Sequence, residues 1–257
     1  MKIASIASGS NGNCYYLGND DDAILVDAGI SARQIVERMT RLGLSLSRLR
    51  GVFISHEHSD HVRGIDVFCR KHSVPVFMTE KTYVSYGLVI NNTLLNYFSP
   101  GKPVKIGNIR VTPFLKSHDA VEPCSFSVSS GNKNVAVMTD IGFECENVKA
   151  HIKNADAIFL ESNYDDHMLE TGFYPAYLKK RIASDIGHLS NTQAARLAVS
   201  HASARLKHIF LSHLSANNNT PQLALGTFKH LIEQRRDLTL DIMLTSREKE
   251  SNLVYLD

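Results

Sequence analysis

The stretch His56-Glu57-His58-Ser59-Asp60-His61 decides the fold of this chain. It places three imidazoles and a carboxylate at H-x-H-x-D-H spacing, directly after the apolar run 51–55. Because residues i and i+2 of an extended segment point the same way, His56 and His58 can grip one metal ion together. Asp60 and His61 follow as the backbone turns, so their side chains face a second, adjacent metal position. The stretch therefore predicts the start of two adjacent metal sites rather than a chance cluster of surface histidines.

Three further polar residues follow short apolar runs that are typical of buried strands. His118 comes after the strand-like stretch 109–115, Asp140 after 134–137, and His213 after 208–210. Side chains at strand ends, and on the loops beyond them, can be held rigidly by a packed scaffold. A single histidine after a strand is more often structural, but in this order the three residues predict the remaining metal ligands.

The order of these motifs resembles the metallo-β-lactamase superfamily, and the resemblance spans nearly the whole chain. It runs through Val26-Asp27-Ala28-Gly29, the H-x-H-x-D-H stretch, His118, Asp140 and His213. It implies an α+β fold, a four-layer αββα sandwich, as a single domain over residues 1–257. An inserted second domain is not expected, because only 72 residues separate Asp140 from His213.

The resemblance also implies two divalent metal ions per chain, zinc or manganese, and a role for each ligand. The residues for the first ion would be His56, His58 and His118. The residues for the second ion would be Asp60, His61 and His213, with Asp140 bridging both ions and Asp27 supporting the ligands from behind. The true β-lactamases have a cysteine where this chain has Asp140, so antibiotic hydrolysis is not expected.

Two motifs resemble a smaller group within the superfamily, the bacterial YycJ/WalJ-type metallo-hydrolases. The first is the opening Ser8-Gly9-Ser10-Asn11-Gly12-Asn13-Cys14, and the second is Gly187-His188-Leu189-Ser190-Asn191 together with residues 211–221. This resemblance implies a phosphodiester hydrolase acting on nucleic acid, namely a 5′-to-3′ DNA exonuclease. DNA would be the substrate, with RNA as the alternative, and the mismatch-repair machinery is the protein partner that the resemblance suggests.

Three residues are predicted to be catalytic: Asp60, His188 and Glu161. A hydroxide activated by two metal ions would attack phosphorus, and His188 would protonate the leaving oxygen, by likeness to ribonuclease Z. Glu161 would be the partner of His188, and the helix that begins near Ser190 would favour a phosphate beside it. The predicted substrate contacts are Ser10, Asn11, Asn13 and Asn217. The asparagines at 217–219 would also fix the loop that presents His213.

Composition agrees with an ordinary globular protein. The chain has 257 residues, 43% of them hydrophobic and 21% charged, with a formal net charge of +2. Four widely spaced cysteines predict reduced thiols and a cytoplasmic location. Neither a membrane-spanning apolar stretch nor a secretory signal is expected from the sequence. The small net charge does not by itself indicate a nucleic-acid partner.

Three alternative functions remain open from the sequence. A small-molecule ester, thioester or lactone hydrolase of the glyoxalase II type would share the metal ligands. A ribonuclease would share both the ligands and the phosphodiester chemistry. A non-catalytic DNA-binding scaffold is the least favoured alternative, because all seven expected ligands are intact.

The expected secondary structure places the motifs on loops after strands. Strands are predicted at 2–7, 14–17 and 23–27, with a hairpin turn at 19–22. Helices are predicted from Ser31 to about Leu42, from His61 to about Lys71, and from Ser190 to Leu206.

Overall fold

The computed structural model describes residues 1–87 and 90–257 of the chain. These residues divide into two compact units. Unit 1 contains residues 1–115, 120–133 and 246–257, and unit 2 contains residues 116–119 and 134–245. The single domain expected over residues 1–257 stays a prediction.

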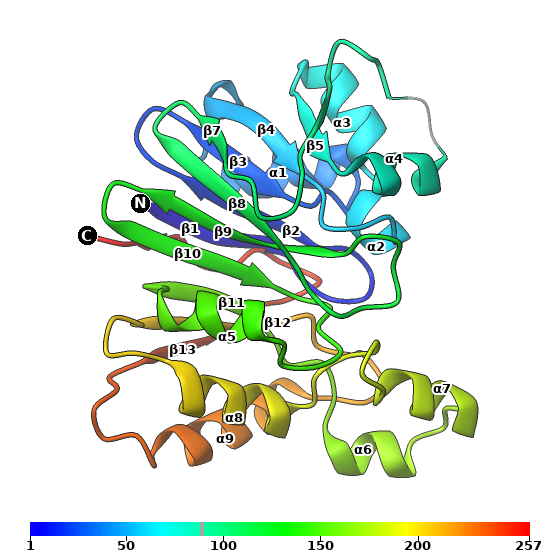
Figure 1. The fold of residues 1–257 in the computed structure, drawn as a ribbon, viewed down its shortest axis with the longest axis vertical. Coiled ribbons are helices and arrows are strands. Elements are labelled where there is room, and N and C mark those ends of the chain that lie inside the picture. The colour runs from blue at the N-terminus through cyan, green and yellow to red at the C-terminus, as the bar shows by residue number, and fades with distance from the viewer. Residues whose placement is uncertain (88–89) are drawn as a thin grey trace. The chain divides into compact units, whose positions relative to one another are not determined.

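Unit 1 contains a mixed seven-stranded sheet in the order β14-β1-β2-β3-β4-β5-β6 (Figure 1). The strands from β14 to β3 pair antiparallel, and those from β3 to β6 pair parallel. Their bounds are Lys2–Ala7 (β1), Cys14–Gly18 (β2), Ala23–Val26 (β3), Leu49–Phe53 (β4), Val76–Met78 (β5), Leu95–Tyr97 (β6) and Val254–Tyr255 (β14). The predicted strands and the hairpin turn between β2 and β3 are confirmed.

A second layer of unit 1 consists of three antiparallel strands. They are Val104–Ile106 (β7), Ile109–Leu115 (β8) and Cys124–Ser130 (β9). Phe126 of β9 meets Phe53 of β4 edge to face, with ring centroids 5.9 Å apart. The two strand layers of unit 1 thus contact each other through aromatic side chains, as two sheets packed face to face do.

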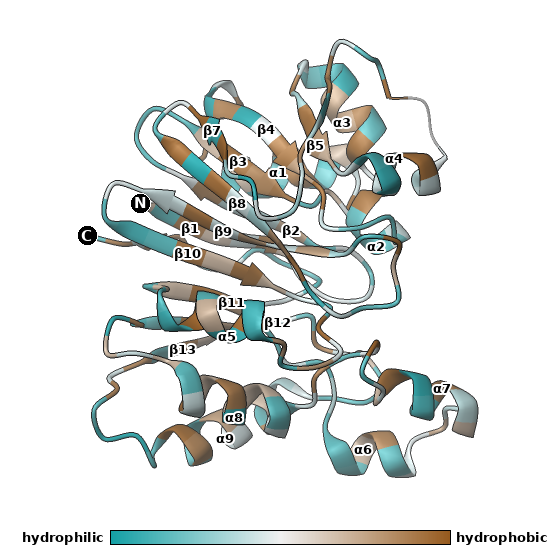
Figure 2. Cartoon of the chain, viewed as in Figure 1, coloured by the Kyte–Doolittle hydropathy of each residue, from teal (hydrophilic) through white to brown (hydrophobic). Residues whose placement is uncertain are grey.

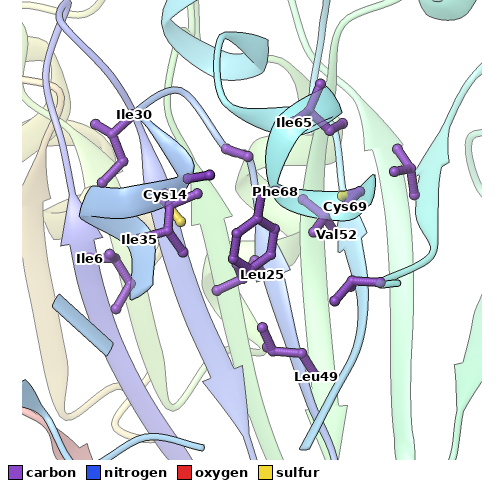
Figure 3. Packing of buried hydrophobic residues seen from close by; sticks show 14 of the residues in the cluster. Ile6, Cys14, Leu25, Ile30, Ile35, Leu49, Val52, Ile65, Phe68 and Cys69 are labelled. Atoms are coloured by element: carbon purple, nitrogen blue, oxygen red, sulfur yellow. The ribbon is translucent and has the colours of Figure 1, made fainter. Parts of the chain in front are cut away.

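Helices cover the other face of the large sheet of unit 1 (Figure 3). The main ones are α1 (Ala32–Arg41) and α3 (Ile65–His72), and shorter ones are α2 (Ser59–Val62), the 3₁₀ turn Leu46–Arg48 and α4 (Glu80–Tyr86). Ile35 of α1 and Phe68 of α3 are completely buried in one cluster with Leu25 and Val52 of the sheet. Each such side chain contributes about 1.5–3 kcal/mol by leaving water.

Unit 2 contains four parallel strands in the order β10-β11-β12-β13. Their bounds are Lys133–Met138, Ala157–Glu161, His208–Ser212 and Asp241–Leu244. The helices of this unit are Glu146–Lys153 (α5), Asp166–Thr171 (α6), Ala176–Ile182 (α7), Asn191–His201 (α8) and Pro221–Ile232 (α9). Helices α8 and α9 each carry hydrophobic and hydrophilic residues (Figure 2), and α8 buries Ala194, Ala195, Leu197 and Ala198.

The first predicted helix is confirmed, and its start has a clear local cause. Ser31 is the N-cap of α1, and its side chain accepts from the backbone N–H of Gln34. The Gln34 side chain accepts in turn from the N–H of Ser31, which completes a capping box. Two N–H groups that the helix itself cannot satisfy are therefore paired.

The other two predicted helices have different limits in the structure. The helix expected over 61–71 is interrupted at Gly64, whose N–H donates to the carbonyl of Ala28. A Cβ at Gly64 would lie 2.0 Å from the carbonyl oxygen of Ile30, so the chain must bend there to pass that loop. The helix expected to reach Leu206 ends at His201, because Ala202 is extended and the chain turns toward β12.

No helix within the described residues is long and apolar enough to span a bilayer. The four cysteines are free thiols.

Candidate metal centre

The H-x-H-x-D-H stretch of unit 1 begins where β4 ends. The ring nitrogens His56 Nε2 and His58 Nδ1 lie 3.1 Å apart. Two nitrogens bound to one tetrahedral zinc ion, each at about 2.0–2.1 Å, would lie about 3.3 Å apart. The two side chains therefore converge as a ligand pair does, which agrees with the i, i+2 argument made from the sequence.

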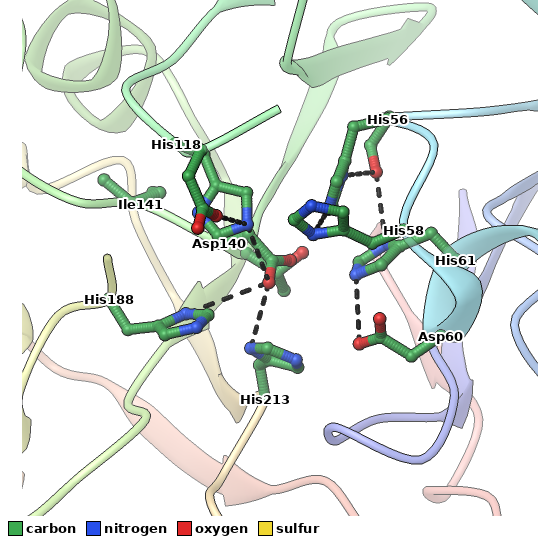
Figure 4. Close-up of polar contacts among 12 residues, drawn as sticks. His56, His58, Asp60, His61, His118, Asp140, Ile141, His188 and His213 are labelled. Carbon is green, nitrogen blue, oxygen red and sulfur yellow. Dashed lines mark hydrogen bonds and ion pairs between the residues drawn. The ribbon is translucent and has the colours of Figure 1, made fainter. Parts of the chain in front are cut away.

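A buried carboxylate organises this loop. Asp27, directly after β3, is completely buried and accepts from the backbone N–H and the hydroxyl of Ser55, at 2.8 and 3.0 Å. It also lies 2.8 Å from His61 Nδ1. Since a carboxylate can only accept, Nδ1 carries the proton and Nε2 of His61 keeps the lone pair that a metal ion would take. That Nε2 faces Asp60 at 3.4 Å (Figure 4).

The glycine-rich opening holds Asp60 from the other side. The Asn13 backbone N–H donates to the carbonyl of Asp60, and its side-chain amide donates to the Asp60 carboxylate at 3.2 Å. Asn13 is completely buried, so its hydrogen bonds position a ligand residue, whereas the predicted substrate contacts Ser10 and Asn11 are exposed. Gly29 packs against the same loop, and a Cβ there would lie 1.6 Å from the Asp60 carbonyl.

His118 is the first predicted ligand of unit 2 and follows β8. Its Nδ1 donates to the carbonyl oxygen of Gly187 at 3.1 Å, which leaves the lone pair on Nε2. Burial lowers the pKa of His118 to about 4, an effect that the Asp140 carboxylate partly offsets. The imidazole is therefore neutral at physiological pH, the form in which histidine binds metal ions.

The other unit 2 residues form one cluster at the ends of β10, β11 and β12. Asp140, Glu161, His188 and His213 each offer one ligand atom, and these atoms all lie within 4.8 Å of one another. Asp140 Oδ1 is 3.3 Å from His213 Nδ1 and 3.8 Å from His188 Nδ1 (Figure 4). The structure thus brings together a predicted bridging ligand, a predicted terminal ligand and both members of the predicted acid pair.

Glu161 is the centre of that cluster. Its two oxygens accept from the backbone N–H groups of Asp140, Ile141 and Leu189, and from Nδ1 of both His188 and His213, the latter two at 2.9 Å. Burial alone would raise the pKa of Glu161, but the charge of His188 and the two imidazole hydrogen bonds bring that pKa to about 2. Glu161 is completely buried, whereas the His188 side chain is 20% exposed. Glu161 therefore acts through the residues that it holds, and His188 is the more exposed of the two imidazoles among them.

Backbone strain marks three predicted site residues. Among the described residues other than glycine, only four have positive φ: Asp27 (61°), Ser73 (53°), Asp140 (56°) and His213 (57°). The left-handed conformation costs roughly 1–2 kcal/mol for such residues, and strain of this kind clusters at functional sites. Each of the three comes directly or nearly directly after a strand, where the chain turns and aims one side chain.

A network of buried amides supports the His213 loop. The Asn163 side chain donates to the carbonyl of His213 at 2.9 Å. Asn219 donates to the carbonyls of Ser162 and Asn163, and pairs with Asn191. The sequence indicated that residues 217–219 fix this loop, and Asn219 does so. Asn217 is exposed, and its amide donates to the hydroxyl of Tyr174 at 2.8 Å.

Sequence reasoning missed two supporting residues. Ser55 contacts Asp27, His56 and His61 through one hydroxyl, and Asn163 holds the His213 backbone. Ser55 stands next to the decisive stretch, so its position was a usable signal. The predicted start of the helix near His188 is confirmed, because Ser190 caps α8 by accepting from the Gln193 N–H. The Asn191 N–H donates to the carbonyl of Tyr164.

Comparisons with known proteins agree with this geometry. Residues 7–177 match the family model described as the metallo-beta-lactamase superfamily. The chain is 38% identical over 238 residues to the exodeoxyribonuclease YycJ of Bacillus anthracis, which covers 91% of this chain and 90% of that relative. It is 34% identical over 239 residues to the exodeoxyribonuclease WalJ of Streptococcus pneumoniae, covering 91% and 89%.

A solved structure supports the fold alone. The metallo-β-lactamase fold protein YhfI from Bacillus subtilis matches with a TM-score of 0.74 at 16% identity, over 99% of each chain. The fold class expected from the sequence is confirmed, and so is the resemblance to the YycJ/WalJ-type proteins.

Proposed function

The chain belongs to the metallo-β-lactamase superfamily, and from that premise we propose that it is a metal-dependent exonuclease that hydrolyses phosphodiester bonds of DNA from the 5′ end. The observation that carries the proposal is the 38% identity, over nine tenths of both chains, to a protein named exodeoxyribonuclease. The donor chemistry of both ligand sets agrees with it.

The residues present fit divalent metal ions. His61 and His118 each direct Nδ1–H at a carboxylate or carbonyl and keep Nε2 free of a proton, the state that metal binding requires. Nitrogen-rich donor sets suit zinc, and mixed histidine and aspartate sets also accept manganese. When bound, such ions would polarise the phosphoryl oxygens and lower the pKa of water.

The assignment of ligands to two ions follows the family and the order of the motifs along the chain. One ion would take His56, His58 and His118, and the other would take Asp60, His61 and His213. Asp140 would be shared by both ions, and Asp27 would fix the rings from behind.

The protein's own residues would handle the proton. His188 is the partly exposed member of the Glu161 cluster, and its Nδ1 lies 2.9 Å from a Glu161 carboxylate oxygen. We assign His188 the transfer of a proton to the leaving oxygen, which contributes about 10²–10⁴-fold in rate in typical enzymes. Glu161 would orient the ring and stabilise its charge, as a carboxylate behind a catalytic histidine does.

Two other functions use the same ligand residues. A thioester or lactone hydrolase and a ribonuclease both remain alternatives, and the DNA substrate is preferred because the relatives' names specify it. The cytoplasmic location and a link to mismatch repair are further parts of the proposal that follow from the resemblance.

Digestion of 5′-labelled and 3′-labelled DNA duplexes, with manganese, zinc or a chelator, tests the proposal. Mononucleotides released from the 5′ end in a metal-dependent reaction are the expected result. Matched reactions with RNA, a thioester and a lactone separate the alternatives. Intact DNA with every metal, together with turnover of one of those other substrates, would overturn it.

A further inference from the structure

A short helical arm of unit 2, residues 164–187, leads directly to His188. It contains α6 and α7, which lie beside one another and apart from α8 and α9 (Figure 1). Tyr164, Leu169 and Ile182 form its small buried core, and Tyr174 and Leu178 pack against them. The arm therefore has a defined inner face and is not a loose loop.

The outer face of α7 carries exposed aromatic and basic side chains. Tyr177, Lys180 and Arg181 follow helical i, i+3, i+4 spacing and are all exposed. Tyr177 is 75% exposed, and Phe173, just before the helix, is fully exposed at 107%. Lys179 points elsewhere, since its ammonium donates to the carbonyl of Glu170 on α6.

Two further apolar residues of unit 2 are exposed. Phe143 and Ile186 are 44% and 51% exposed. They lie near each other, because a Cβ on Gly142 would come within 2.7 Å of the Cα of Ile186. Apolar side chains that are exposed next to one another, rather than singly, commonly mark a binding surface.

The arm is fixed to the residues of the candidate centre. The His188 N–H donates to the carbonyl of Ile182 at 2.9 Å, at the end of α7. The Arg181 guanidinium pairs with Asp119, the residue after His118. The Ser117 hydroxyl donates to the carbonyl of Asp185. A strand bound on α7 would thus be held at a fixed position relative to His188 and His118.

Resting on the function proposed above, we propose that the outer face of α7 binds a single-stranded segment of the DNA substrate next to the bond being cut. Phe173 and Tyr177 would stack on bases, and Lys180 would contact a phosphate. Stacking needs bases whose faces are free, which a single strand offers and an intact duplex does not. The aromatic side chains would contact the bases of such a strand, and the cationic side chain would contact its phosphates.

Binding of a fluorescein-labelled, phosphorothioate-linked oligothymidylate to the metal-loaded protein tests this proposal, because the modified linkages resist cleavage. Phe173→Ala and Tyr177→Ala should each weaken binding on the order of tenfold, without changing its salt dependence. Lys180→Gln should lower the slope of log affinity against log salt by about 0.7, the contribution of one phosphate contact to single-strand binding. Tyr255→Ala and Lys153→Gln are the matched controls, and they should bind as the wild type does.

Hydrolysis of bis(p-nitrophenyl) phosphate separates this proposal from the proposed function. The arm variants should turn over this small diester at the wild-type rate while losing affinity for the oligonucleotide. Wild-type binding by all three arm variants would overturn the arm proposal and leave the nuclease standing. The arm proposal would also be overturned if the arm variants lost small-diester turnover as much as they lost oligonucleotide binding. It would be overturned as well if the substitutions changed only the association of the protein with itself. If the arm variants bind the oligonucleotide more weakly but the wild-type protein hydrolyses no phosphodiester, the proposed function would be wrong.

Discussion

The two units present their proposed metal-ligating side chains in different ways. In unit 1 the residues come from one continuous loop, 56–61, whose spacing is visible in the sequence. In unit 2 they come from separate strand ends, with His118, Asp140 and His213 spread over nearly a hundred positions of the chain. A local motif reveals the first set, whereas only the fold brings the second set together.

Each set is nevertheless held by a completely buried carboxylate of its own. In unit 1, Asp27 accepts from Ser55 and His61. In unit 2, Glu161 accepts from the Asp140 turn, from Leu189 and from two imidazoles. A buried carboxylate is stable only when its oxygens are hydrogen-bonded, so each one dictates the orientation of the rings around it.

Removing one ligand from either unit should produce the largest effect. Asp60→Ala in unit 1 and His213→Ala in unit 2 should each abolish metal-dependent DNA cleavage, a loss of several kcal/mol of transition-state stabilisation. Nucleotide release measures the loss, and circular dichroism should show that the fold survives. Activity near the wild-type level in either variant would mean that its unit supplies no essential ligand.

Neutralising the two buried carboxylates should give a smaller and unequal loss. Asp27→Asn should cost about 10–100-fold in activity or metal affinity, as is usual for groups behind metal ligands. Glu161→Gln should cost more, about 10²–10⁴-fold, because it also removes the negative charge 2.9 Å from the ring to which we assign proton transfer. Glu57→Gln, in the same loop as the unit 1 ligands, is the control and should leave kcat unchanged. Equal losses for Asp27→Asn and Glu161→Gln would argue against a proton-transfer role for His188.

Glycines at the two loops should be intolerant of a side chain. Gly29→Ala places a Cβ 1.6 Å from the Asp60 carbonyl, and Gly142→Ala places one 2.0 Å from the Asp185 carbonyl. Both should lower the free energy of unfolding by about 1–3 kcal/mol or more, since backbone must move. Gly226→Ala, in α9 with open space around it, should instead stabilise by about 0.5–1 kcal/mol. Urea denaturation measures all three, and unchanged stability in the first two would contradict the packing described.

The acid sensitivity of unit 2 should be the subtlest effect. The folded pKa of Glu161 is about 2, below the unfolded value of about 4.3, so the folded state binds fewer protons. Its contribution to stability is complete above pH about 4.3 and is lost as the pH falls toward about 2. The difference in the free energy of unfolding between the metal-free wild-type protein and metal-free Glu161→Gln should therefore become smaller as the pH falls from 5 to 3. The expected slope corresponds to about one proton, which the unfolded state binds and the folded state does not. A gap that is the same at both pH values would contradict the lowered pKa.

Much of this arrangement was predictable because the decisive patterns are local. The H-x-H-x-D-H spacing, the strand before each ligand and the capped start of α1 all depend on neighbouring residues. The strained turns at Asp27, Asp140 and His213 were not predictable, since their backbone angles depend on hydrogen bonds from distant segments. The interruption at Gly64 has the same origin, because the carbonyl that it approaches belongs to another loop.

The structure also changed the interpretation of individual side chains. Asn13 was predicted to bind substrate but is buried against Asp60, whereas Glu161 lies beside His188, the residue whose partner it was predicted to be. The sequence identifies the residues whose side chains can bind metal or take part in catalysis. Burial decides whether each one touches the substrate or holds another residue that does.

Metal-dependent exonuclease activity is best tested by titrating metal into chelator-stripped protein and measuring nucleotide release from 5′-labelled DNA at each step. We expect no release without metal, and an initial rate that rises and reaches its plateau at two ions per chain. Full activity in the stripped protein would contradict it, and so would a DNA substrate that stays intact after both ions are bound.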